Sequence, residues 1–189
     1  MIKIGILGEI GSGKSYIAKN FGYPVFNADL EVSKLYKNDR KIFIKLKKNL
    51  PKYIYSFPIN KKEISKAILA NKSNLNKIVK IVHLEVRRKM NMFLRKNKHK
   101  RIVILDIPLL LENKINKKKD ILVFVESNRF DIEERLKKRG GFNKKIIENF
   151  KKIQLSLDYK KKISHFIIKN NFTKKSVKQD VQNILEKIL

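Results

Sequence analysis

The sequence contains no cysteine, few acidic residues and no long apolar run. The absence of cysteine excludes disulfide bonds and thiolate metal sites. No apolar segment approaches the roughly 20 residues that a membrane-spanning helix needs. The chain opens with the apolar run 2–7, which is too short and too early for a signal peptide. We therefore expect a cytoplasmic protein that has no membrane partner.

Acidic residues are scarce beside basic ones: 17 Asp and Glu stand against 46 Lys and Arg, a formal net charge of +29. A field of this size favours anionic partners such as nucleotides, nucleic acid or anionic membranes. The lysines are nevertheless spread along the whole chain, and Asn and Ile are abundant with them, as an AT-rich coding sequence would produce. Aromatic residues are not interleaved with them in an RNA-binding pattern. Composition therefore explains the charge better than a dedicated nucleic-acid partner does.

Short apolar runs alternate with helical patterns along the 189 residues. Continuous apolar strands separated by helices are typical of a parallel sheet covered on both faces. The sequence therefore predicts a single α/β domain spanning 1–189, with a five-stranded parallel sheet flanked by helices. The expected strands are 2–7, 24–26, 101–105, 121–125 and 163–168, and the expected helices around them are 14–21, 30–36, 130–139, 142–161 and 173–189.

A long helical stretch separates the second expected strand from the third. Ser73 is a good helix N-cap, and apolar residues recur at helical spacing after it. Pro51 and Pro58 interrupt the first part of the stretch. The pattern predicts a helical insertion over 37–100, placed over one end of the sheet.

The segment GEIGSGKS, residues 8–15, fits the phosphate-binding pattern G-x-x-x-x-G-K-[ST] and lies between an expected strand and an expected helix. In such a loop, backbone N–H groups and the helix N-terminus bind phosphate oxygens. Lys14 should reach the β- and γ-phosphates, and the Ser15 hydroxyl should bind Mg²⁺. A Gly-rich turn with a chance Lys-Ser is the alternative, which the strand–helix context disfavours. The expected ATP contacts are Gly11, Ser12, Gly13, Lys14, Ser15 and Tyr16.

Two carboxylates follow expected strands, at the sheet edge where open α/β folds bind ligands. Asp106 ends the apolar run 102–105 and is either a Mg²⁺ ligand or a cap of the strand end before Pro108. Asp29 follows the second strand. It can accept a proton from a hydroxyl that attacks the γ-phosphate, or it can cap the helix 30–36. Position alone prefers neither alternative for either residue.

These features and several later motifs together resemble the dephospho-CoA kinase family, and the matches keep the family's order and spacing over nearly the whole chain. The resemblance implies a phosphotransferase with an alcohol acceptor. With ATP and Mg²⁺ it would phosphorylate the ribose 3′-hydroxyl of dephospho-CoA, the last step of coenzyme A biosynthesis. It also implies a P-loop kinase fold with a helical substrate-binding insertion and a lid. The matching positions are 9–16, 27–29, 83–87, 108–112, Arg135, Arg139, Gln154, Lys160 and 168–170.

The resemblance also implies roles for individual residues. Asp29 matches the family's proposed catalytic base, and Asn170 matches a position that contacts the nucleotide. His83 and Arg87 match positions near the acceptor. They lie four residues apart on one expected helix face, so a solvated helix edge is the alternative for them. The expected acceptor contacts are Asp29, His83, Arg87, Pro108 and Leu109.

Two arginines, Arg135 and Arg139, come shortly before Gly140 and Gly141, a natural helix C-cap and hinge. The resemblance implies a lid over 127–150 whose arginines neutralise charge on the transferring phosphoryl group. Lid closure would also exclude water from the reaction. Arg139, which is nearer the hinge, is the expected catalytic arginine. An ordinary basic surface helix is the alternative.

Several positions depart from the family pattern without changing the expected activity class. Glu9 stands where the family has Gly, and Tyr16 where it has Thr. Asn27 replaces an Asp beside the expected base, and Leu84 replaces a Pro. Ser-His at 164–165 stands where the family has Ala-Asp.

Three alternative functions stay open. The first is another P-loop kinase that acts on a nucleoside or nucleotide, which substrate screening would separate. The second is a nucleic-acid-associated P-loop ATPase, which predicts salt-dependent binding to RNA or DNA; the short chain and the lack of further helicase-like motifs disfavour it. The third is a protein that binds nucleotide without turnover. The sequence does not indicate an oligomeric state.

Overall fold

The computed structural model describes residues 1–138 and 143–189, which form two compact units. The first, which we call the sheet unit, consists of residues 1–27, 97–138 and 154–189. The second, which we call the helical unit, consists of residues 28–96 and 143–153. No helix in these described residues is long and apolar enough to cross a membrane.

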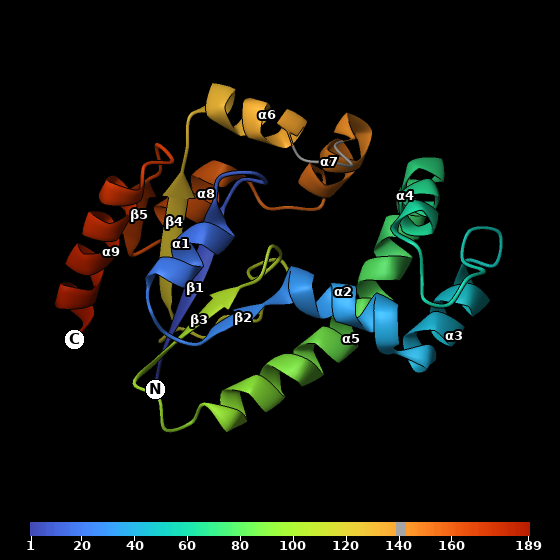
Figure 1. The fold of residues 1–189 in the computed structure, drawn as a ribbon, viewed down its shortest axis with the longest axis horizontal. Coiled ribbons are helices and arrows are strands. Elements are labelled where there is room, and N and C mark those ends of the chain that lie inside the picture. Colours follow the sequence, from blue (N-terminus) through green and yellow to red (C-terminus); the bar gives the residue numbers. More distant parts are fainter. Residues whose placement is uncertain (139–142) are drawn as a thin grey trace. The chain divides into compact units, whose positions relative to one another are not determined.

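Within the described residues, the sheet unit is built on five parallel strands in the order β2-β3-β1-β4-β5 (Figure 1). The five-stranded parallel sheet predicted from the apolar runs is thereby confirmed. The strand that ends in Asp106 is the direct neighbour of the strand that leads into the phosphate loop, as expected. The strands are β1 (Ile2–Gly8), β2 (Val25–Asn27), β3 (Ile102–Asp106), β4 (Ile121–Glu126) and β5 (Phe166–Lys169).

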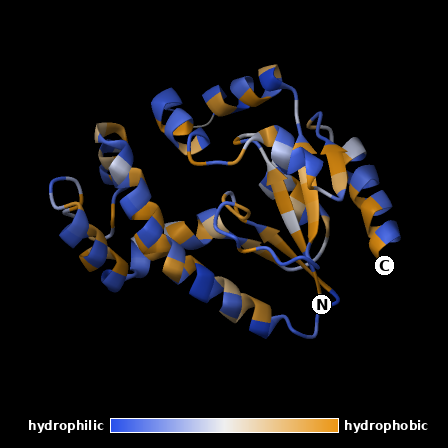
Figure 2. Ribbon diagram, turned by 180° about the vertical axis from the view of Figure 1, so that it is seen from behind, coloured by the Kyte–Doolittle hydropathy of each residue, from blue (hydrophilic) through white to orange (hydrophobic). Residues whose placement is uncertain are grey.

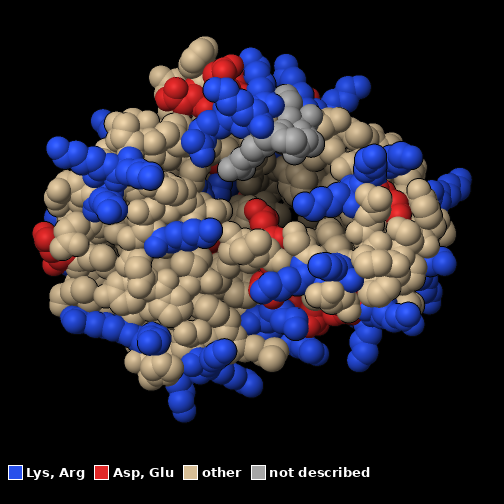
Figure 3. Space-filling model, viewed as in Figure 1, with Lys and Arg blue, Asp and Glu red and all other residues tan. Residues whose placement is uncertain are grey.

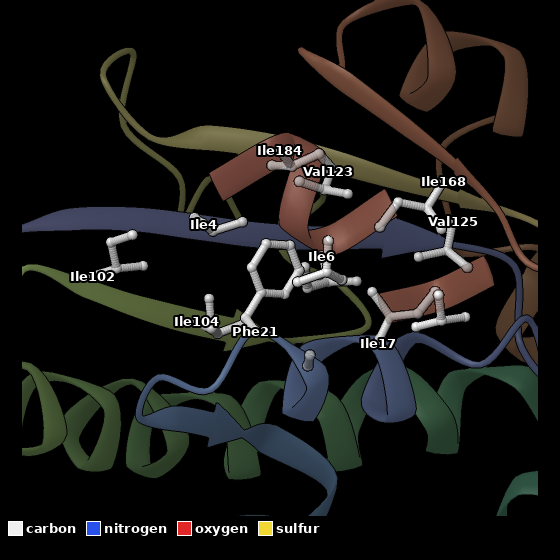
Figure 4. Packing of buried hydrophobic residues seen from close by; sticks show 13 residues of the cluster. Ile4, Ile6, Ile17, Phe21, Ile102, Ile104, Val123, Val125, Ile168 and Ile184 are labelled. Carbon is white, nitrogen blue, oxygen red and sulfur yellow. The ribbon is translucent and has the colours of Figure 1, made fainter. Parts of the chain in front are cut away.

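The core of the sheet unit explains why its strands are apolar almost throughout (Figure 2). All five residues of β3 are buried, which is typical of a strand covered on both faces. On one face, Ile17 from the first helix, Phe21 just after that helix and Ile184 from the last helix pack against strand residues such as Ile6 (Figure 4). The helices of this unit are α1 (Lys14–Asn20), α6 (Arg129–Lys138), α8 (Leu157–Lys162) and α9 (Lys174–Ile188).

The helical unit is organised around one long helix whose apolar residues recur at helical spacing. This helix begins at Lys72, so the predicted N-cap Ser73 already lies inside it. The Asn71 side chain takes the capping role, because its Oδ1 accepts a hydrogen bond from the Ser73 N–H at 2.8 Å. The helices are α2 (Ala28–Asn38), α3 (Arg40–Asn49), α4 (Lys61–Ala70), α5 (Lys72–Lys96) and α7 (Lys144–Lys151).

The prediction of a single helix over 142–161 is wrong. The chain forms two helices, α7 and α8, with an irregular segment between them. In that segment the Leu155 N–H donates to the Glu112 carboxylate at 2.9 Å instead of to a helical carbonyl. Ser156 then caps α8, since its hydroxyl accepts from the Tyr159 N–H. The periodic pattern continues across the break, but a distant carboxylate interrupts the helix.

Candidate active site

The phosphate loop joins the end of β1 to the start of α1, as the sequence predicts. Gly8 and Gly13 have φ angles of 141° and 92°, in the left-handed region that favours glycine. A Cβ atom on Gly8 would lie 2.6 Å from the backbone oxygen of Val125, and one on Gly13 would collide with the side-chain amide of Asn170. Both positions therefore require glycine if the loop is to follow this path.

Lys14 lies with its side chain against the loop. Its Nζ donates to the backbone oxygens of Gly8, at 3.2 Å, and of Glu9, at 2.7 Å. A phosphate oxygen is a charged acceptor and forms a stronger hydrogen bond with an ammonium than a carbonyl does. A phosphate bound in the loop would therefore compete successfully for this ammonium.

Two polar side chains hold the loop from the neighbouring strands. The Ser12 carbonyl accepts hydrogen bonds from Asn170 Nδ2, at 2.8 Å, and from Ser127 Oγ, at 2.9 Å. Asn170 is buried, and its Oδ1 accepts from the Phe172 N–H at 2.9 Å. The sequence predicted Asn170 as a nucleotide contact, which stays a prediction, and it did not predict Ser127. The available signal was their position, since each directly follows an apolar strand, β5 or β4.

Ser15 and Asp106, the two expected Mg²⁺ ligands, both contact the side chain of Asn27. Asn27 Nδ2 donates to Asp106 Oδ2 at 2.5 Å and to Ser15 Oγ at 3.4 Å. Asp106 is a buried carboxylate at the end of β3. A hydroxyl and a carboxylate within reach of one nitrogen suit Mg²⁺, which takes few protein ligands and completes its shell with water and phosphate. In the described ranges 1–138 and 143–189, no group of three His, Cys, Asp or Glu residues could hold a metal without such help.

The motif 108–112 contacts the segment between α7 and α8. Glu112 Oε1 pairs with Lys160 Nζ at 2.7 Å, and the lysine side chain is 1% exposed. Gln154 Nε2 donates to the Pro108 backbone oxygen at 3.4 Å. Glu112, Gln154 and Lys160, which match the family pattern, thus connect the motif 108–112 to α8 and to the segment before it. Pro108 and Leu109 are half-buried, and their contact with an acceptor stays a prediction.

Replacing Lys160 with Met is expected to destabilise the protein by about 3–5 kcal/mol, because the buried Glu112 carboxylate would lose its cation. Urea unfolding followed by circular dichroism measures the loss. The control is Lys161→Met, which removes a half-exposed pair with Glu126 and should cost about 1 kcal/mol or less. Equal losses for the two variants would contradict a structural role for the buried pair.

The expected acceptor residues Asp29, His83 and Arg87 belong to the helical unit, whereas the loop and Asp106 belong to the sheet unit. Asp29 lies exposed inside the first turn of α2, one residue after the helix begins, so it is not the residue that caps it. His83 and Arg87 lie one turn apart on α5. Burial, and then the positive charge of Arg87, lower the pKa of the His83 imidazole below its ordinary value. The shift favours the neutral form of the His83 imidazole.

Arg135, one of the two expected lid arginines, lies on α6 with its guanidinium over the ring of Phe172, 4.1 Å from the ring centroid. Its Nε is buried and makes no hydrogen bond within the described part of the chain. Arg139, together with the expected hinge at Gly140 and Gly141, lies outside the described residues. Tyr16 is on α1, directly after the loop, and is 37% exposed. The contacts of these residues with substrates stay predictions.

The basic side chains lie scattered over the face drawn in Figure 3, among other residues, and acidic side chains lie between them. Scattered lysines are what a composition rich in lysine produces. The figure therefore gives no reason to set one part of this face apart as a nucleic-acid site.

Comparisons of the sequence with a family model and with curated proteins point to one family. A family model described as dephospho-CoA kinase matches residues 2–176. A dephospho-CoA kinase from Wolbachia pipientis wMel is 34% identical over 190 residues, which cover 98% of this chain and 97% of the relative.

The fold is also shared with solved structures. A crystal structure from Thermus thermophilus superposes with a TM-score of 0.78 at 23% identity, covering 100% of this chain and 98% of that one. A dephospho-CoA kinase from Campylobacter jejuni superposes with a TM-score of 0.63 at 18% identity, covering 98% of this chain and 96% of that one. These two likenesses show the fold.

Proposed function

The chain belongs to the dephospho-CoA kinase family, and from this premise we propose that it transfers the γ-phosphoryl group of ATP to the ribose 3′-hydroxyl of dephospho-CoA. The products are coenzyme A and ADP. The observation that carries the proposal is a glycine-dependent phosphate loop with Ser15, Asn27 and Asp106 gathered beside it. A cytoplasmic location, expected from the sequence, is part of the proposal.

The sheet unit supplies the ATP side of the reaction. The loop's N–H groups bind the phosphates, and Lys14 moves from the Gly8 and Glu9 carbonyls to the β- and γ-phosphate oxygens. Ser15 and Asp106 would hold Mg²⁺, which when bound neutralises charge on those oxygens. Asn170 and Ser127 bind the Ser12 carbonyl and so help to hold the loop in the shape in which its N–H groups can bind phosphate.

The expected acceptor residues Asp29, His83 and Arg87 lie on α2 and α5. Asp29 takes the proton of the 3′-hydroxyl as it attacks the γ-phosphorus. Arg87 offers a cation to the anionic part of dephospho-CoA, and His83 offers a neutral imidazole. Arg139 neutralises the transferring phosphoryl group when the lid closes.

The proposed function is tested by ADP release from ATP and Mg²⁺, with and without dephospho-CoA, and by the mass of the product. Strong dependence on dephospho-CoA and a product heavier by one phosphate are expected. If dephospho-CoA does not stimulate ADP release, the proposal is overturned. The same assay with nucleosides and then with RNA would then identify the acceptor or the partner.

Replacing Lys14 with Ala is expected to reduce kcat in this assay by about 10²–10³, because one preorganised charge at the transferring phosphate is lost. The matched control is Lys19→Ala, an exposed lysine in the last turn of the same helix, which should keep the wild-type rate. A Lys14→Ala variant as active as the control would mean that residues 8–15 are not a working phosphate loop.

A further inference from the structure

Asn27 is the one side chain shown to contact both expected metal ligands in the described residues. Its Nδ2 donates to Asp106 Oδ2 and to Ser15 Oγ. The contact with Asp106 follows from the sheet itself, because Asn27 and Asp106 are register partners at the carboxyl ends of β2 and β3. The register therefore places the two residues side by side at the same edge of the sheet, within reach of each other's side chains.

The amide has two chemical properties that a carboxylate at this position would lack. It is a donor, so it satisfies one oxygen of the buried Asp106 and orients the group. It is also neutral, so the protein brings only one negative charge to the pair of metal ligands. Two carboxylates in register at this distance would repel each other and attract a divalent cation on their own.

A single carboxylate and a hydroxyl are a weak site for a free divalent cation. Mg²⁺ gives up its water reluctantly and is usually held by one or two carboxylates together with substrate phosphates. Because Asn27 is neutral, the further negative charge that a divalent cation needs must come from the nucleotide. An Asp at position 27 would supply much of that charge from the protein itself.

We propose that Asn27 is a positioning residue that makes metal binding depend on nucleotide: it holds Ser15 and Asp106 in place and keeps the site too weakly charged to bind the ion alone. This inference rests on the proposed function, because it needs a nucleotide in the loop. The metal ion therefore enters the enzyme bound to the nucleotide. The nucleotide-free protein has no divalent cation bound at Ser15 and Asp106.

The test uses Mn²⁺ as the probe and measures free Mn²⁺ by electron paramagnetic resonance, with and without ADP, at one pH. The wild-type protein should bind Mn²⁺ at least tenfold more tightly when ADP is present. The Asn27→Asp variant should bind Mn²⁺ without ADP at least tenfold more tightly than the wild type does. The Asn27→Ala variant should keep its affinity for metal-free ADP and lose about tenfold in affinity for ADP when Mn²⁺ is present.

Asn20→Asp is the matched control, since it adds the same charge to the same unit on α1, where Asn20 bonds the Tyr16 carbonyl. It should leave Mn²⁺ binding unchanged. If Asn27→Asp binds Mn²⁺ without ADP no better than the wild type or this control does, the inference is overturned. Because Asn and Asp have the same shape, this comparison stands even where Asn27→Ala does not fold.

The outcomes separate the inference from the proposed function. Nucleotide-dependent Mn²⁺ binding that Asn27→Asp converts to nucleotide-independent binding supports the inference, even if dephospho-CoA fails to stimulate ADP release. A wild-type enzyme that phosphorylates dephospho-CoA but shows the same Mn²⁺ affinity in all variants supports the kinase and overturns the role of Asn27.

Discussion

The Asp29→Asn variant is expected to bind ADP and Mg²⁺ like the wild type and to form coenzyme A about 10²–10⁴ times more slowly. The reason is that an amide cannot accept the proton of the attacking hydroxyl, and general-base catalysis is worth about that factor. Asp29 is exposed in the first turn of α2, and Asn has the same shape as Asp, so the substitution should leave the core of the protein intact. The rate is measured as ADP release with dephospho-CoA, and nucleotide affinity by calorimetry.

The matched control for Asp29 is Glu31→Gln, in the same turn of the same helix. Glu31 pairs with Lys34 at 2.6 Å, so its removal tests the effect of losing a negative charge there without removing the expected base. It should keep kcat within about twofold, as is usual for surface charges. A fall in both variants by the same factor would show that the charge of the helix end matters and that Asp29 is not the base.

The elements that could be predicted are those whose cause is local. β1, β3 and β4 are largely buried, so each is a mainly apolar run that a sequence pattern detects. The phosphate loop is equally local, since its glycines and its Lys-Ser pair are consecutive in the chain. The neighbouring position of β3 followed from the role expected for Asp106, and the strand order bears it out.

The elements that could not be predicted depend on partners distant in the sequence. Glu112 interrupts the helix between α7 and α8. Its carboxylate accepts a hydrogen bond from the N–H of Leu155, which is 43 residues away in the sequence. The bond from Asn170 to the loop spans 158 residues, and nothing near Asn170 distinguishes a support for the loop from a nucleotide contact. The same holds for Asn27, whose departure from the family pattern is visible in the sequence although its two contacts are not.

The Arg139→Ala variant is expected to lose about 10³–10⁵ in kcat, which is the contribution of an arginine that neutralises a transferring phosphoryl group. The effect should fall on kcat and leave nucleotide affinity nearly unchanged, because the charge develops mainly in the transition state. Arg139→Lys should recover part of the rate, since lysine restores the charge but not the planar fork of donors. Steady-state kinetics with dephospho-CoA as the varied substrate compare both variants with the wild type.

Two further variants test whether the loss of kcat is specific to Arg139 or follows the removal of any nearby cation. Lys138→Ala removes an exposed cation from the last turn of α6 and should leave kcat within about twofold. Arg135→Ala removes the cation stacked on Phe172, which contacts the side of the loop that holds Gly13, so it should weaken nucleotide binding more than kcat. If Arg135→Ala abolishes turnover while Arg139→Ala does not, the transferring phosphoryl group is neutralised by Arg135. In that case Arg135 would have to leave the Phe172 ring when the lid closes. The Arg135→Ala variant would then lose kcat, because the positive charge is needed only at the transition state.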